Sequence, residues 1–127
     1  MKYERWLQLG ALILPAMIAV STGCDSRPAV ESSTAEASVT GKVVIKGKPA
    51  TKGTVVFDPA NYMRKDVSAR SATIEPDGTY RVTTLVGLNS VRVAGPEAEA
   101  AGAAYSSLDF EVKSGSNSFD ISIPTGQ

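Results

Sequence analysis

The sequence predicts an all-β protein, built as a single antiparallel β-sandwich of seven strands within residues 38–127. Three observations predict it. From Val39 onward, apolar residues alternate with polar ones, which is the two-residue period of half-buried strands. Turn signals rich in glycine, proline, asparagine and aspartate separate these short runs. The region has no apolar stripe of helical period, and its length suffices for one hydrophobic core.

Residues 1–23 have the three parts of an export signal. Lys2 and Arg5 give a basic start, Trp6–Val20 is almost entirely apolar, and Ser21–Gly23 are small. The apolar part is shorter than the ~20 residues that a transmembrane helix needs. The segment therefore predicts an exported protein from which residues 1–23 are removed.

The single cysteine of the chain directly follows this segment. Thr22-Gly23-Cys24 resembles the lipobox of bacterial lipoproteins, although Ser21 stands where that pattern has an aliphatic residue. The resemblance implies cleavage between Gly23 and Cys24 and attachment of a diacylglycerol to the Cys24 thiol. Two acyl chains hold a protein stably on a membrane, whereas one does so only marginally. The alternatives are ordinary secretion with Cys24 as a free thiol, and an uncleaved membrane anchor.

Residues 24–37 are expected to form a flexible tether behind this anchor. Val30 is the one large aliphatic residue after Cys24 in this stretch, so the segment cannot bury enough surface to offset its ordering entropy. A flexible coil of this length spans about 20 Å. The domain at residues 38–127 is therefore predicted to lie close to the membrane.

Seven alternating runs are the expected strands, and glycine- or proline-containing turns separate several of them. The runs are 39–45, 54–57, 72–74, 80–82, 91–93, 108–112 and 119–123. In the last two, Leu108, Phe110 and Val112 share one predicted core face, as do Phe119 and Ile121 with Ile123. The alanine-rich stretch 98–104 is expected to form a loop or one short turn, because it lacks large apolar residues.

Four of these segments resemble the opening and the central hairpin of the carboxypeptidase regulatory-like domains. They are Val39–Val43, Lys46–Ala50, Gly53–Phe57 and Pro76–Tyr80. Residues 108–123 are similar to the ending of small bacterial lipoproteins that carry one such domain. The resemblance implies a prealbumin-like or immunoglobulin-like sandwich of about seven strands without catalysis. Val86–Val91 departs from the family pattern, which often has an aromatic residue there.

The composition excludes several classes of function. The chain has no histidine, so the commonest general base and nitrogen metal ligand are absent, and one cysteine cannot form a CxxC zinc site. Basic and acidic residues balance at 13 each without a basic block, which argues against nucleic-acid binding. The carboxylates are scattered and form no calcium loop. We therefore expect no catalytic residue, no metal and no cofactor, with a paired-carboxylate hydrolase as the one enzymatic alternative.

Two loops are longer than connection requires. Asp58–Val67 contains Tyr62 and Arg64, and Gly95–Ser107 contains Tyr105. If successive strands reverse direction, the first loop emerges where the tether enters and the second at the opposite end. Tyr62, Arg64 and Tyr105 are the candidate contacts for a partner or ligand, because exposed aromatic tips stack on sugars and proteins. The alternative is that both loops are solvated connectors with their tyrosines folded back.

The sequence thus predicts a non-catalytic protein anchored by lipid to the cell envelope, periplasmic or on the outer surface. Its domain is expected to act as a structural or protein-interaction module that contacts an envelope partner through a sheet edge or the distal loop. The alternative is a module that binds carbohydrate or another small ligand, either secreted or tethered to the membrane.

Overall fold

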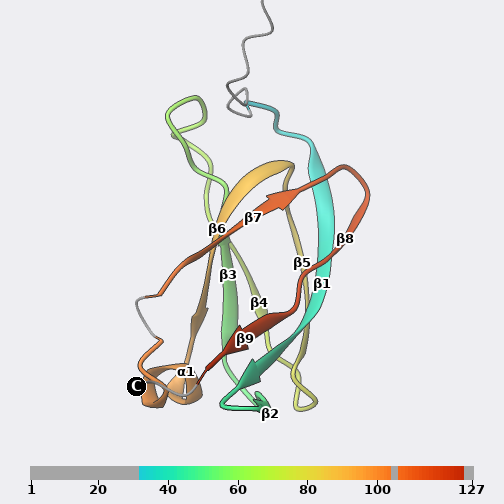
Figure 1. Cartoon of the computed structure of the whole chain (residues 1–127). Coiled ribbons are helices and arrows are strands. Elements are labelled where there is room, and N and C mark those ends of the chain that lie inside the picture. The colour runs from blue at the N-terminus through green and yellow to red at the C-terminus, as the bar shows by residue number, and fades with distance from the viewer. Residues whose placement is uncertain (1–31, 104–105, 125–127) are drawn as a thin grey trace, which may run out of the picture.

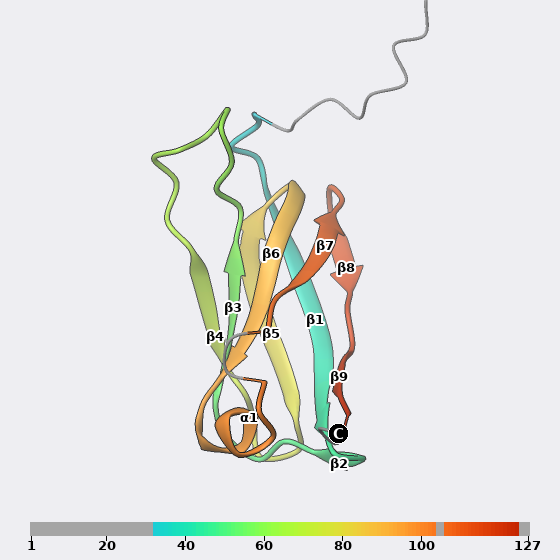
Figure 2. The ribbon, with the colours of Figure 1, turned by 60° about the vertical axis from the view of Figure 1, so that its left-hand side comes forward.

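The computed structural model describes residues 32–103 and 106–124, which form two facing β-sheets and one short helix (Figure 1). The five-stranded sheet contains β1 (Glu36–Ile45), β2 (Lys48–Pro49), β5 (Thr79–Leu85), β8 (Ser116–Ser118) and β9 (Ile121–Ile123). The four-stranded sheet has the order β4 (Arg70–Thr73), β3 (Thr54–Asp58), β6 (Gly87–Ala94) and β7 (Leu108–Val112). The helix α1 (Pro96–Ala100) follows β6. The arrangement is sandwich-like, as the second view shows (Figure 2).

The predicted strand count of seven is wrong, because the described residues form nine strands. The first turn contributes the short strand β2, and residues 116–118 form β8 where a turn was expected. The prediction of a purely antiparallel arrangement is also wrong. Both β8 and β9 pair with β1 in parallel, because the chain after β7 turns back and runs along the free side of β1.

The core lies between the two sheets and follows the alternation seen in the sequence. Along β1, Val39 and Val43 point inward and are completely buried, and Phe57 on β3 faces them from the other sheet. The Phe57 and Tyr80 rings lie 6.1 Å apart between centroids. The larger fully buried aliphatic side chains are Val39, Val43, Val55, Val91, Val112 and Ile121. Burial of this apolar surface is the main source of stability for a domain of this kind.

The start of β6 contains a buried polar residue. Asn89 is fully buried, and its amide nitrogen donates to the Leu85 and Gly87 carbonyl oxygens at 2.9 and 3.0 Å. The Thr84 hydroxyl donates to the Asn89 side-chain oxygen at 2.7 Å. These bonds offset the cost of burying the amide and fix the turn between β5 and β6.

The parallel strand that β8 and β9 form beside β1 is interrupted at Gly41. The Phe119 amide still donates to the Thr40 carbonyl oxygen at 2.9 Å, but the Lys42 amide donates to the Asp120 carboxylate instead of a main-chain carbonyl. A Cβ on Gly41 would overlap the Phe119 carbonyl oxygen and lie 2.6 Å from its carbonyl carbon. The connection between β8 and β9 therefore passes over a position that only glycine can occupy.

Tyr80 fills the space beside this glycine. It pairs with Gly41 across β1 and β5, and its hydroxyl donates to the Phe119 carbonyl oxygen. Burial raises the pKa of the Tyr80 phenol, and the nearby Asp120 carboxylate raises it further. Tyr80 therefore remains a neutral donor that links β5 to the connection between β8 and β9.

The two ends of the domain are distinct, as the alternation of strand direction predicted. The chain enters β1 at one end, and the loop between β3 and β4 projects at that same end (Figure 1). Helix α1, a short turn as expected for the alanine-rich stretch, lies at the opposite end (Figure 2). β1 begins at Glu36, two residues before the predicted domain start. Among the described residues, no helix is long and apolar enough to span a membrane.

Replacing Gly41 by alanine tests the close crossing, in which the connection between β8 and β9 passes over Gly41. We expect Gly41→Ala to lower the free energy of unfolding by about 3 kcal/mol or more, because β1 and the β8–β9 connection must separate. Urea denaturation measures the change. Gly47→Ala is the control: Gly47 has a positive φ of 79° but open space around it, so a loss of about 1–2 kcal/mol is expected. Equal losses in the two variants would contradict the close crossing.

Candidate functional site

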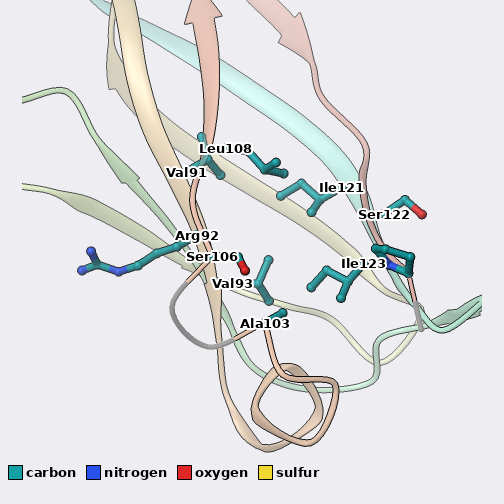
Figure 3. Close-up of a pocket in the computed structure, with 10 residues that line it drawn as sticks. Val91, Arg92, Val93, Ala103, Ser106, Leu108, Ile121, Ser122 and Ile123 are labelled. Atoms are coloured by element: carbon teal, nitrogen blue, oxygen red, sulfur yellow. The ribbon is translucent and has the colours of Figure 1, made fainter. Parts of the chain in front are cut away.

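An apolar groove of about 240 Å³ opens between the two sheets on the side of β7 and β9 (Figure 3). Its walls are aliphatic side chains of β6, β7 and β9 with the segment that follows α1. The lining residues are Val91, Arg92, Val93, Ala103, Ser106, Leu108, Ile121, Ser122, Ile123 and Pro124. Figure 3 shows the Arg92 side chain directed away from the groove. The Ser122 hydroxyl is also directed away from the groove, whereas the Ser106 hydroxyl lies beside Val93 (Figure 3). The groove is therefore an apolar recess with few polar groups.

The groove exists because β7 is shorter than its neighbour. β7 pairs with β6 from Gly87 to Val91, and β6 continues to Ala94 with β3 on one side but no described strand on the side of β7. Closer to the start of β6, the gap between the sheets is closed by Phe110 and Phe119, whose rings stack with centroids 4.2 Å apart. Beyond that stack the groove has a buried floor, where Val91 and Ile121 are 1% and 2% exposed, and the exposed apolar side chain is at its rim.

Leu108 stands at the rim of this groove. Its exposed fraction is 44%, although the alternation of residues 108–112 predicted a core position. Val112 at the other end of β7 is 1% exposed, as predicted. The prediction was wrong for Leu108 because alternation reports which face a residue occupies, not whether the opposite sheet still covers that face. No pattern in the sequence marked the groove.

Helix α1 supports the far end of the groove. The Glu97 carboxylate accepts hydrogen bonds from the Thr51 amide, at 3.1 Å, and from the Thr51 hydroxyl. These bonds lower the pKa of Glu97 below its ordinary value, and the bond from the hydroxyl contributes more than the bond from the amide. The Ala103 amide donates to the Ala98 carbonyl oxygen at 2.9 Å. The chain after α1 is thereby held against the sheets, where Ala103 lines the groove.

A second, more open groove of about 610 Å³ runs beside Thr40, Tyr80 and Asp120. Its polar groups are partly committed to the fold, because Asp120 accepts from the Lys42 amide and the Tyr80 hydroxyl donates to the main chain. In the part of the chain that the structure describes, no three histidine, cysteine, aspartate or glutamate side chains gather as a metal site would require. The ionisable side chains that line this second groove are Lys42, Glu75, Tyr80, Arg81 and Asp120.

The loop between β3 and β4 presents Tyr62 at its tip. Tyr62 is 68% exposed and its neighbour Met63 is 55% exposed. The Asn61 side-chain oxygen accepts from the amides of Met63, at 2.8 Å, and Arg64, at 3.1 Å. This turn holds the tip in place and directs Tyr62 and Met63 away from the sheets. Tyr62 therefore has the accessibility that a contact residue needs.

Arg64, the second candidate contact in this loop, is buried rather than presented to a partner. Its exposed fraction is 5%, and its guanidinium donates to three main-chain carbonyl oxygens. These belong to Pro59 at 2.7 Å, Ser33 at 2.9 Å and Val86 at 2.7 Å. Arg64 thus joins the loop, the chain entering β1 and the turn between β5 and β6. Sequence reasoning missed this role because all three acceptors are main-chain atoms.

The other predicted site residues, Gly23, Cys24 and Tyr105, lie outside the described residues. The structure therefore reports nothing on the lipid anchor, on the cleavage position or on the distal tyrosine.

No family model matches the chain, including any for the carboxypeptidase regulatory-like domains, and no curated protein matches it. Among solved structures, a DUF3823 family protein from Parabacteroides merdae superposes with a TM-score of 0.56 at 15% identity over 73% of this chain. The two share a fold. A DUF3823 family protein from Bacteroides ovatus matches 70% of the chain at 17% identity with a TM-score of 0.46. The chain spans about half the length of these proteins, 48% and 44%, and the likeness concerns the fold alone.

Removing the Arg64 guanidinium tests its role in the fold. We expect Arg64→Met to lower the free energy of unfolding by roughly 2–4 kcal/mol, because one buried and two partly buried carbonyl oxygens lose their donor. Amide exchange at Val86, which donates to Ala35, should accelerate as the entering chain loosens. Arg92→Met, at an exposed position, is the control and should change stability by less than about 0.5 kcal/mol. An Arg64 variant as stable as this control would contradict the assigned role.

Proposed function

We propose that the protein is a non-catalytic lipoprotein of the cell envelope, and that its domain, of the carboxypeptidase regulatory-like type, binds a protein partner. The observation that supports binding of a protein partner is the apolar groove beside Leu108. An accessible recess between sheet edges accommodates apolar side chains of a partner, and exposed main-chain groups at the edges can pair with its backbone. The groove combines the two contact surfaces expected from the sequence, a sheet edge and the distal loop.

The character of the groove favours a protein over a small polar ligand. Its volume of about 240 Å³ is below the 300–1,000 Å³ typical of small-molecule pockets. Sugar recognition relies on aromatic faces combined with convergent polar groups, and the groove lining contains no aromatic residue. Acid–base or nucleophilic catalysis would need ionisable groups within reach of one another. The groove lining includes a single ionisable side chain, Arg92, which points away.

The position of the groove suits an anchored protein. The entering chain is held at Ser33 and Ala35 by Arg64 and Val86, at the end from which the loop of Tyr62 projects. The groove lies toward the other end, beside the segment that follows α1. A protein held by lipid at Cys24 would therefore leave the groove accessible from the space beyond the membrane.

The anchor is tested by the intact mass of protein extracted with detergent from its native membrane. We expect the mass of residues 24–127 plus a diacylglycerol and any further acyl chain, and the loss of that modification in Cys24→Ala. Cysteine is required because its thiol accepts the diacylglycerol. A soluble, unmodified chain cleaved near Cys24 would instead show free secretion and would remove the anchor from the proposal.

The interaction is tested by photo-crosslinking in intact cells from Ser106, an exposed residue whose side chain lines the groove (Figure 3). We expect one defined adduct that is absent when the photoreactive residue stands at Ser71, exposed on β4 at a different sheet edge. Leu108→Asp should reduce the Ser106 adduct roughly ten-fold, because a charge at the rim must be desolvated on contact. Leu108→Met, which keeps the rim apolar, is the matched control. An adduct whose yield is unchanged by Leu108→Asp would overturn the assignment of the groove as the partner-binding surface.

A further inference from the structure

The exposed large apolar side chains of the described residues are not scattered over the surface. Four are exposed: Tyr62 at 68%, Met63 at 55%, Leu88 at 56% and Leu108 at 44%. Leu108 belongs to the groove. The other three lie at the end where the chain enters β1, which leaves a concentration of apolar surface that the fold itself does not use.

Hydrogen bonds locate these three residues at that end without reference to any view. Arg64, next to Met63 in the chain, donates to the carbonyl oxygens of Ser33 and Val86. Val86 in turn donates to the Ala35 carbonyl oxygen at 2.9 Å and lies two residues before Leu88. The entering chain, the loop tip and the start of β6 are therefore tied together. Figures 1 and 2 both show the loop between β3 and β4 projecting beyond the strands there.

We propose that this end rests on the lipid bilayer, with Tyr62, Met63 and Leu88 as its membrane-contact face. The proposal rests on the lipid anchor at Cys24. Nine peptide units separate Cys24 from Ser33, a reach of at most about 30 Å. Because Arg64 holds Ser33 beside the loop, the anchor keeps this end of the domain within that reach of the membrane.

The chemistry of the face fits a membrane interface. Tyrosine is enriched at the level of lipid headgroups because its ring is apolar and its hydroxyl polar, and methionine and leucine side chains enter the acyl boundary. Lys65 and Lys113 near this end can direct their ammonium groups to lipid phosphates. Asp66 and Glu111 balance them, and Glu36 is paired with Arg70 at 3.4 Å. The contact is therefore apolar insertion with little dependence on salt.

Fluorescence of a single tryptophan measures the contact in the mature, lipidated chain reconstituted in phosphatidylcholine–phosphatidylglycerol vesicles. The one natural tryptophan, Trp6, is removed with residues 1–23, so Tyr62→Trp provides a unique reporter. We expect a blue-shifted emission and roughly two-fold or greater quenching by lipids brominated near the glycerol end of their acyl chains. The quenching should persist in high salt.

Lys48→Trp is the matched control, because Lys48 is exposed in the hairpin of β1 and β2 at the opposite end. The same anchor holds it on the same vesicles, and we expect no quenching. Adding Met63→Ser and Leu88→Ser to Tyr62→Trp should reduce the quenching at least about two-fold while the protein stays on the vesicles.

The outcomes separate this proposal from the anchor itself. A Tyr62→Trp chain that carries the diacylglycerol by mass but whose tryptophan stays unquenched overturns the membrane contact and retains the anchor. A photoreactive residue at position 62 that forms a defined protein adduct in cells, while the Tyr62→Trp reporter is not quenched by brominated lipid, indicates a protein partner on this face, which also overturns the contact. A chain without the lipid overturns both.

Discussion

The Phe119 carbonyl oxygen occupies the space above Gly41 where any other residue would carry its Cβ, and the arrangement of both sheets depends on this close passage. It lets the last segment of the chain lie along β1 in parallel, so β1 is paired on both sides. Asp120 supplies the acceptor that the interrupted ladder lacks, and Tyr80 fills the space beside the glycine. Backbone polar groups are thereby satisfied where the regular hydrogen bonding of the sheet is broken.

This crossing also determines where the domain is closed and where it is open. The segment that passes over Gly41 brings Phe119 against Phe110 of β7, and their stacking closes one part of the side between the sheets. Beyond the Phe110–Phe119 stack, β7 no longer pairs with β6, while β9 continues to pair with β1. The groove beside Leu108 is thus a consequence of unequal strand lengths. Its floor is formed by buried core residues, and Leu108 is the exposed apolar side chain at its rim.

Arg64 holds together the segments at the other end of the domain, where the chain enters β1. A buried guanidinium is costly unless its donors are satisfied. Three carbonyl oxygens from separate segments accept from Nε and Nη1 of Arg64, while Nη2 is buried without a hydrogen-bond partner among the described residues. The side chain that sequence reasoning assigned to partner contact instead holds the loop in place. Tyr62 and Met63 are presented to the exterior because Arg64 points inward. The burial of Arg64 and the exposure of Tyr62 and Met63 therefore depend on each other.

The sequence by itself determined the all-β class, the placement of the main strands and the ends from which the two long loops emerge, because alternation and turn residues act locally. It also supplied the prediction of a lipid anchor at Cys24, which lies outside the described residues. Only the tertiary structure decided the parallel pairing of β8 and β9, the burial of Arg64 and the exposure of Leu108. Each depends on atoms distant in the chain, chiefly main-chain carbonyl oxygens and a neighbouring strand that stops short, and these leave no local pattern.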